Sequence, residues 1–404
     1  MFFFNKNKIL DTAKSFFYNG FFFEGLYFLK SKRLYFFFNN YSNKTKSNYL
    51  FLYGAFLTNT GKYKKGLIYL KKALSGSYDD KSEIYYYIIN TYISLYENEK
   101  VIYYFSILAE RAFSPFYLIL SYYKCIKNKI NLNITFDSIK ELENDSKESL
   151  EDILSSVLLM MLENKTQDAY KMILDIEAAE FKEKYYYKLI FFTLLFQTKK
   201  YQQIVDYFKD NNKNIISMDI LKIYSATLYK LELFEESKKV LEDILILRPN
   251  HPEALLNIAK ICYRKKKYTE TLELLKKAVK IKSSCKDEIL FLLSVTFGHL
   301  GLLNEAFKSI KNIKENTLIY FKALFNLSLI YHDLNYYDEA KETFSKIDKQ
   351  YIPSEKYYNC GKIILFDKEK NPKTDKVNYI IKFLPLYIII FSGIVFVILY
   401  FFIK

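Results

Sequence analysis

Histidines and clustered carboxylates are the residues of this chain that could carry acid–base or metal chemistry, and they are scattered. The three histidines, His251, His299 and His332, lack further ligands at the short spacing that a metal site needs. The acidic run 141–145 lies among lysines and is typical of a solvated helix face. The phosphate-loop and metalloprotease patterns GxGxxG, GxxxxGK[ST] and HExxH are absent. We therefore expect no catalytic, cofactor-binding or metal-binding residue, and we predict that the chain is not an enzyme.

Cysteine usage adds no redox or metal motif. The four cysteines are Cys125, Cys262, Cys285 and Cys360. They show neither a CxxC pair nor a Cys/His ligand spacing, which favours a reducing compartment. One enzymatic alternative is an active site in the irregular region 116–149, and no polar cluster there supports it.

A recurring pattern of apolar and small residues predicts the elements that must position any functional side chain. The pattern returns every 33 to 35 residues along most of the chain. In its clearest copy, 252–286, Ile258, Ala259 and Cys262 share one face of a first helix. The face of the second helix carries Tyr268, Thr271, Leu275 and Ala278. Such a period predicts stacked helix pairs, in which small residues such as Ala306 and Ala340 allow a close helix approach.

The pattern resembles the tetratricopeptide repeat. The residues that match its consensus best are Gly54, Leu57, Gly61, Tyr63, Leu70, Ala73, Tyr331, Tyr337, Ala340 and Phe344. The resemblance is strong over 47–75 and 218–350 and weak over 116–149, where Ile130 and Leu132 replace the expected turn glycine and tyrosine. The repeat units are expected to start near Lys6, Ser47, Ser82, Phe116, Leu150, Tyr185, Met218, Pro252, Asp287 and Phe321.

The resemblance implies an all-α, right-handed solenoid of about ten helix pairs, with a further helix at the C-terminus. The expected segments are a divergent basic N-terminal repeat at 1–46, the repeat array at 47–353, a capping helix at 354–367, a polar basic linker at 368–382 and a transmembrane helix at 383–403.

In this family the first helix of each pair lines a groove that holds a peptide, so the resemblance implies a protein or peptide partner. The candidate groove residues are Lys222, Lys230, Asn257, Lys260, Arg264, Phe291, His299, Phe325, Asn326 and His332. The cations could take carboxylates of the partner, and the two phenylalanines could accept an apolar anchor.

Some members of the family clamp the C-terminus of a chaperone through a set of lysine, asparagine and arginine residues. Here Lys222 and Asn257 match two positions of that clamp. Ala226, Glu288 and Leu292 replace three others, so we do not expect the clamp to form.

Positive charge is concentrated near the N-terminus. Residues 1–78 contain thirteen lysines and arginines against only Asp11 and Glu24, whereas the whole chain has a net charge of +15. A basic end could bind nucleic acid, anionic lipid or an acidic protein, or it could be an ordinary solvated surface. Helical solenoids that bind RNA repeat their contact residues at fixed inner positions, and no such recurrence is present, so nucleic acid is the less favoured partner.

The C-terminus carries the second strong signal of the sequence. Residues 383–403 form 21 consecutive uncharged positions, which as a helix would extend about 31 Å and cross a bilayer. Lys368, Lys370, Lys373, Lys376 and Lys382 precede this segment and only Lys404 follows it. Positive charge stays on the cytoplasmic side, so the repeat array is expected in the cytoplasm. The sequence thus predicts a single-pass, tail-anchored scaffold that recruits a protein partner.

Overall fold

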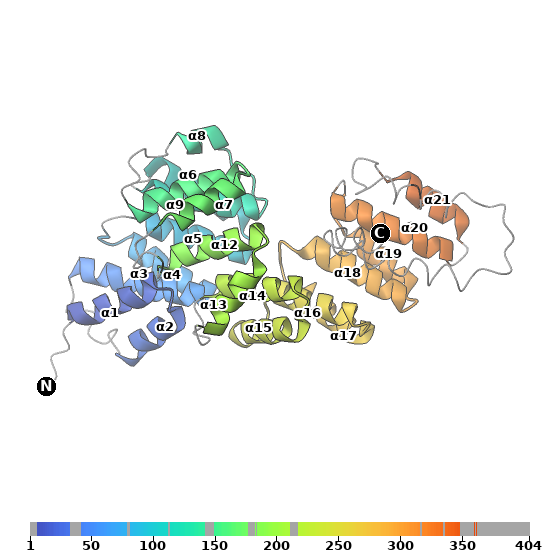
Figure 1. Ribbon diagram of the computed structural model, residues 1–404, viewed down its shortest axis with the longest axis horizontal. Coiled ribbons are helices and arrows are strands. Elements are labelled where there is room, and N and C mark those ends of the chain that lie inside the picture. Colours follow the sequence, from blue (N-terminus) through green and yellow to red (C-terminus); the bar gives the residue numbers. More distant parts are fainter. Residues whose placement is uncertain are drawn as a thin grey trace. The chain divides into compact units, whose positions relative to one another are not determined.

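The computed structural model describes most of the repeat array. The described residues are 6–32, 42–78, 81–111, 114–141, 149–176, 182, 184–210, 217–315, 317–333, 336–347, 359 and 361. Within them the structure contains twenty helices and no strand (Figure 1), so the expected all-α helical repeat is confirmed. The chain divides into two compact units, Met1–His251 (unit 1) and Pro252–Lys404 (unit 2).

The described part of unit 1 contains seven helix pairs. They are α1 (Lys6–Tyr18) with α2 (Phe22–Ser31), α3 (Asn43–Asn59) with α4 (Tyr63–Leu74), α5 (Ser82–Leu95) with α6 (Asn98–Arg111), α7 (Pro115–Lys127) with α8 (Phe136–Lys140), α9 (Leu150–Leu162) with α10 (Thr166–Leu174), α12 (Tyr185–Gln197) with α13 (Tyr201–Asp210), and α14 (Met218–Lys230) with α15 (Phe234–Leu247).

Unit 2 contains three pairs in its described part. They are α16 (Pro252–Arg264) with α17 (Tyr268–Ala278), α18 (Lys286–His299) with α19 (Leu303–Lys311), and α20 (Leu318–Asp333) with α21 (Tyr337–Ser345). The first helices of six of the ten pairs begin at the residue where the repeat predicts a unit, and the other four begin one to four residues earlier. The local apolar period therefore fixes the helix boundaries closely.

The turn inside the pair has a common conformation in nine of the ten described pairs. One residue of left-handed backbone occupies this turn in nine pairs: Gly20, Gly61, Tyr96, Lys129, Asn164, Lys199, Glu232, Lys266 and Gly301. The left-handed residue of the fourth pair is Lys129, so the prediction that Ile130 takes the place of the turn glycine was wrong by one position. Ile130 and Leu132 are buried and pack in the core instead. A side chain can occupy this position because the cost is only about 1–2 kcal/mol.

Small residues lie where the helices of a pair approach closely. A Cβ atom built on Gly54 of α3 would lie 2.9 Å from the Cγ atom of Leu70 and 3.0 Å from its backbone nitrogen in α4. In unit 2, Ala259 on the first helix α16 and Ala306 and Ala340 on the second helices α19 and α21 are fully buried. The core of each pair is therefore formed by the residues that the repeat pattern singles out.

Candidate functional site

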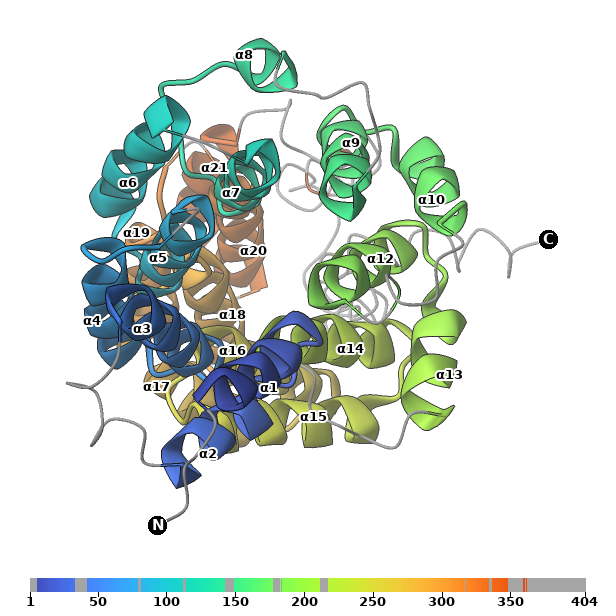
Figure 2. The same ribbon diagram turned by 90° about the vertical axis from the view of Figure 1, so that its left-hand side faces the viewer.

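The first helices of the pairs line the inside of unit 1. Figure 2 shows α3, α5, α7, α9, α12 and α14 on the inside, with α4, α6, α10, α13 and α15 on the outside. This inner surface is the place where the family resemblance implies a peptide groove. The side chains on it decide whether the groove is open to a partner.

A buried carboxylate and three tyrosines occupy part of this inner surface. Glu83 of α5 is only 5% exposed, and the Tyr117 hydroxyl of α7 donates a 2.7 Å hydrogen bond to its Oε1 atom. The Tyr186 hydroxyl of α12 lies 3.4 Å from the same oxygen and 3.3 Å from the Tyr87 hydroxyl. Burial raises the pKa of all three tyrosines well above the usual value, so the hydroxyls stay protonated. The network joins the third, fourth and sixth pairs.

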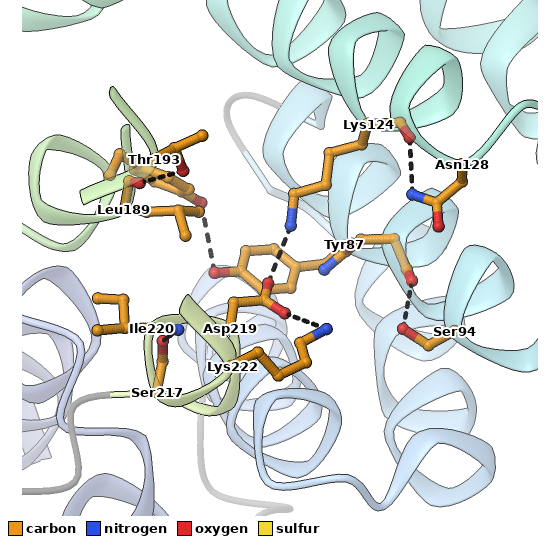
Figure 3. Close-up of polar contacts among 12 residues, drawn as sticks. Tyr87, Ser94, Lys124, Asn128, Leu189, Thr193, Ser217, Asp219, Ile220 and Lys222 are labelled. Carbon is orange, nitrogen blue, oxygen red and sulfur yellow. Dashed lines mark hydrogen bonds and ion pairs between the residues drawn. The ribbon is translucent and has the colours of Figure 1, made fainter. Parts of the chain in front are cut away.

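An ion-pair cluster joins the fourth and seventh pairs (Figure 3). The Nζ atom of Lys124 lies 3.0 Å from Oδ2 of Asp219, and the Nζ atom of Lys222 lies 3.1 Å from Oδ1. Burial alone would raise the pKa of Asp219, but the two lysines outweigh it and hold that pKa far below its usual range. The Ser217 side chain accepts a hydrogen bond from the backbone nitrogen of Ile220 and fixes the start of α14. That cap places Asp219 and Lys222 on the inner surface.

Two aromatic contacts also join helix pairs of unit 1 that are distant in the sequence. The rings of Phe22 and Tyr185 pack edge to face at 4.9 Å and join the first pair to the sixth. Arg248, just after α15, lies 4.6 Å above the ring of Tyr63, and its guanidinium donates a 3.3 Å hydrogen bond to the Tyr63 hydroxyl. Much of the inner surface of unit 1 is therefore filled by contacts within the chain.

The two groove residues predicted in unit 1 take up different positions. Lys222 belongs to the ion-pair cluster with Lys124 and Asp219, and its side chain is half-exposed. Lys230, in the last turn of α14, is half-buried.

The predicted aromatic anchors of unit 2 are also core residues. Phe291 is 8% exposed and Phe325 is 6% exposed. The ring of Phe325 packs 6.1 Å from that of Phe344, and a Cβ atom on Gly361 would lie 2.9 Å from the Phe325 ring. Asn326 is buried as well, and its side chain donates a 3.1 Å hydrogen bond to the carbonyl of Lys322. These three side chains therefore present little surface to a groove, and Phe344 packs against the ring of Phe325.

Both predicted groove histidines pack against aromatic rings. The Nε2 atom of His299 lies 2.8 Å from the hydroxyl of Tyr263, and its ring stacks on Tyr268 at 4.6 Å. Burial lowers the pKa of His299, which favours the neutral ring. His332 packs edge to face on Tyr337 at 5.4 Å. Among the described residues, no group of three His, Cys, Asp or Glu side chains is placed to hold a metal ion.

A short row of polar side chains lies on α16, the first helix of unit 2. Asn257, Lys260 and Arg264 follow one another at helical spacing along α16, and each is half-buried. The Nζ atom of Lys260 forms a 2.9 Å ion pair with Glu288 of α18, whose side chain is 49% exposed. A partner carboxylate could replace such an exposed acceptor at little cost. We call Asn257, Lys260 and Arg264 the polar row.

The inner contacts of unit 1 correspond to one position of the repeat and not to a catalytic or metal-binding motif. Glu83, Tyr117, Tyr186 and Asp219 are each the second residue of a predicted repeat unit. A column of polar and phenolic groups at one repeat position therefore indicated that these side chains could meet.

The predicted C-terminal segments lie largely outside the described residues. This applies to the span 383–403, the linker 368–382 and the capping helix 354–367, of which only Asn359 and Gly361 are described. In the part of the chain that the structure describes, no helix combines the length and the apolar character needed to cross a bilayer.

Comparison with known proteins gives a family match and several solved helical proteins. The crystal structures include MamA (15% identity over 36% of this chain and 84% of that chain, TM-score 0.31). They also include the APC/C hetero-tetramer Cut9–Hcn1, with 10% identity over 89% of this chain and 76% of that chain and a TM-score of 0.38. YrrB, described as a TPR protein with an unusual peptide-binding site, has 14% identity over 57% of this chain and 98% of that chain and a TM-score of 0.31. No curated protein matches this sequence. A tetratricopeptide repeat model matches residues 252–285 and 321–349, which cover α16–α17 and most of α20–α21.

Proposed function

We propose that this chain is a protein-binding scaffold whose partner docks on unit 2. The observation that carries this proposal is the difference between the inner surfaces of the two units. On that surface of unit 1, the Glu83 network and the Lys124–Asp219–Lys222 cluster join helix pairs that are distant in the sequence. In unit 2 the polar row stays half-exposed on a repeat that the family model matches. Binding rather than catalysis is the function that such a row can perform.

The chemistry of the polar row favours an acidic segment of the partner. Lys260 and Arg264 supply two cations within one turn of helix, and Asn257 adds an amide that can donate and accept hydrogen bonds. A carboxylate of the partner would take over the Nζ atom of Lys260 from Glu288. The long-range attraction would speed encounter and would weaken as the salt concentration rises.

Quantitative crosslinking and pull-down with the solubilised full chain tests this proposal. We expect the double variant Lys260→Glu/Arg264→Glu to capture at least about tenfold less partner than the wild type, corresponding to about 1.4 kcal/mol. The matched control is Lys276→Glu/Lys277→Glu, which reverses two exposed charges on the second helix α17. Equal capture by wild type and the polar-row variant, or an equal loss in the control, would show that the partner docks elsewhere.

We further propose that residues 383–403 anchor the scaffold in a membrane, with the repeat array on the cytoplasmic side. The support is the run of 21 uncharged residues and the excess of lysines before it. Anchoring would raise the local concentration of a membrane-bound partner without any new contact.

Removal of residues 377–404 tests the anchor. The full chain should float with neutral vesicles through an alkaline carbonate wash, and the truncated chain should stay in the soluble fraction. Flotation of the truncated chain under the same wash would mean that another segment holds the protein on the bilayer.

A further inference from the structure

The outer surface of unit 1 carries a dense group of exposed cations between α2 and α4. Two large apolar side chains lie among them. We call the following six exposed residues the basic face: Tyr27, Lys30, Lys62, Lys64, Lys65 and Ile68. Helical spacing places Tyr27 beside Lys30 on α2, and Ile68 beside Lys64 and Lys65 on α4.

Few carboxylates lie on the helices that carry the lysines of the basic face. Burial lowers the pKa of Lys62, and the nearby charges of Lys30 and Lys65 lower it further, so these three lysines of the basic face lie near one another. Glu24 is the single carboxylate on α2, α3 and α4. Within the described residues, none of the four lysines of the basic face forms an ion pair. Their positive charge is therefore directed to solvent.

The apolar members of the basic face distinguish between anionic partners. Tyr27 is 76% exposed and Ile68 is 54% exposed, although neither contributes to the core. A tyrosine flanked by lysines suits the headgroup level of a bilayer, and an isoleucine can enter the acyl boundary just below it. A nucleic acid would use the charge and the phenol ring but would leave the isoleucine without a role.

We infer that the basic face docks unit 1 on a bilayer surface that contains anionic phospholipids. The lysines would neutralise lipid headgroups, and Tyr27 and Ile68 would enter the interface between them. Each lysine near such a surface contributes about a fivefold change in partitioning, from about 1 kcal/mol per basic residue. This inference does not depend on the C-terminal anchor. With the anchor it would give unit 1 a second attachment and a fixed orientation on the membrane.

The chain contains no tryptophan, so a single introduced tryptophan reports on one surface. The reporter is Ile68→Trp in the full chain, reconstituted into vesicles of phosphatidylcholine alone or with about one third phosphatidylserine. We expect a blue-shifted emission and quenching by brominated lipid only when phosphatidylserine is present, with reversal in high salt because exposed charges are screened. The matched control is Tyr103→Trp, at a 61% exposed position on the outer face of α6 beside Glu99. Its emission should be the same in both kinds of vesicle.

Charge reversal completes the test. Adding Lys62→Glu and Lys65→Glu to the reporter should shift the docking equilibrium towards the undocked state by more than about 100-fold, since the net charge of the basic face falls by four units at about fivefold each. Equal quenching with and without phosphatidylserine, no quenching in either, or equal quenching of the Tyr103→Trp control would each overturn the inference. An emission shift with single-stranded RNA but none with anionic vesicles would assign the basic face to nucleic acid instead. Flotation with neutral vesicles reports separately on the anchor, so failure of the anchor and failure of the basic face are distinguishable.

Discussion

Unit 1 and unit 2 are built from the same helix pair but use their inner residues differently. In unit 1 these residues join pairs that are far apart in the sequence, as Lys124 and Asp219 do across 95 positions. In the described part of unit 2, Lys260 with Glu288 and Tyr263 with His299 join neighbouring pairs. The residue types at the inner positions therefore determine whether helix pairs that are distant in the sequence contact one another or only neighbouring pairs do.

The difference should appear in how the two units unfold. An open array of repeats is stabilised by each pair and its contacts with the next pair, so it can lose stability locally. Where helix pairs that are distant in the sequence contact one another, unfolding breaks all of those contacts together. We therefore expect unit 1 to unfold as one cooperative block and unit 2 to respond pair by pair.

The largest expected difference is the response to alkaline pH. Burial raises the pKa of Tyr86, Tyr87, Tyr117 and Tyr186 in unit 1 well above 10, whereas an unfolded tyrosine ionises near pH 10. A raised pKa in the folded state means that the stability is complete below pH 10 and falls as the pH rises above it. The four tyrosines together should cost unit 1 roughly 5 kcal/mol at pH 11.

Tyrosinate absorbance at 295 nm measures this response cleanly, because the chain has no tryptophan. We expect a cooperative rise above pH 10 that coincides with loss of helical circular dichroism. Tyr86→Phe is the control, since Tyr86 forms no described side-chain hydrogen bond and is fully buried. This variant should keep its stability at pH 7 and lose about one quarter of the alkaline effect. Exposed tyrosines such as Tyr27 and Tyr103 ionise gradually, so a gradual rise without any cooperative step above pH 10 would contradict the buried network.

The second prediction removes one residue from the centre of unit 1. Tyr186→Ala should lower the free energy of unfolding of unit 1 by about 3–5 kcal/mol, the cost of deleting a large buried aromatic side chain. Tyr186→Phe keeps the ring and should cost only about 1 kcal/mol for the lost hydroxyl contacts with Glu83 and Tyr87. Urea denaturation should show the transition of unit 1 moving while that of unit 2 stays. Movement of both transitions would mean that the units are not energetically separate.

The helix pairs could be predicted from the sequence because their signal is local. The apolar period that predicts units at Ser82, Tyr185 and Pro252 depends only on residues within one or two turns, and α5, α12 and α16 begin at those residues. The close approach at Ala340 follows from the same period, and Ala340 is fully buried.

The contacts across unit 1 could not be predicted in the same way. The pairing of Phe22 with Tyr185, or of Tyr63 with Arg248, depends on the curvature of the array, which accumulates from small rotations between successive repeats. The groove prediction also assumed that every inner position faces solvent. Phe325 shows where this fails, because Phe344 and Gly361 cover it.

The third prediction is that overpacking substitutions in unit 2 lower the stability of single helix pairs. Ala340→Leu and Ala259→Leu should each cost roughly 1–3 kcal/mol, because both alanines are fully buried at a close helix approach. Hydrogen exchange should accelerate mainly in α20–α21 for the first variant and in α16–α17 for the second. The control is Lys276→Leu at an exposed position of α17, which should change neither. Uniform acceleration throughout unit 2 would indicate that its three pairs unfold together.

The smallest predicted effects concern the left-handed turn residues, where backbone conformation can be separated from packing. Gly301 has a φ of 71°, and an added Cβ atom there would meet nothing within 4 Å. Gly301→Ala should therefore lower stability by about 1 kcal/mol through conformation alone. Lys266 has a φ of 59° at the equivalent turn of the preceding pair, so Lys266→Gly should raise stability by a few tenths to about 1 kcal/mol.

Glu232 occupies the same turn position in unit 1, with a φ of 61°. Glu232→Gly should therefore raise the stability of unit 1 by the same amount as Lys266→Gly raises that of unit 2, since the turn geometry is shared by both units. Thermal denaturation of the three glycine and alanine variants beside the wild type measures these differences. Opposite signs for Glu232→Gly and Lys266→Gly would show that closure of unit 1 changes the energetics of its turns. Equal signs would confine the difference between the units to their inner side chains.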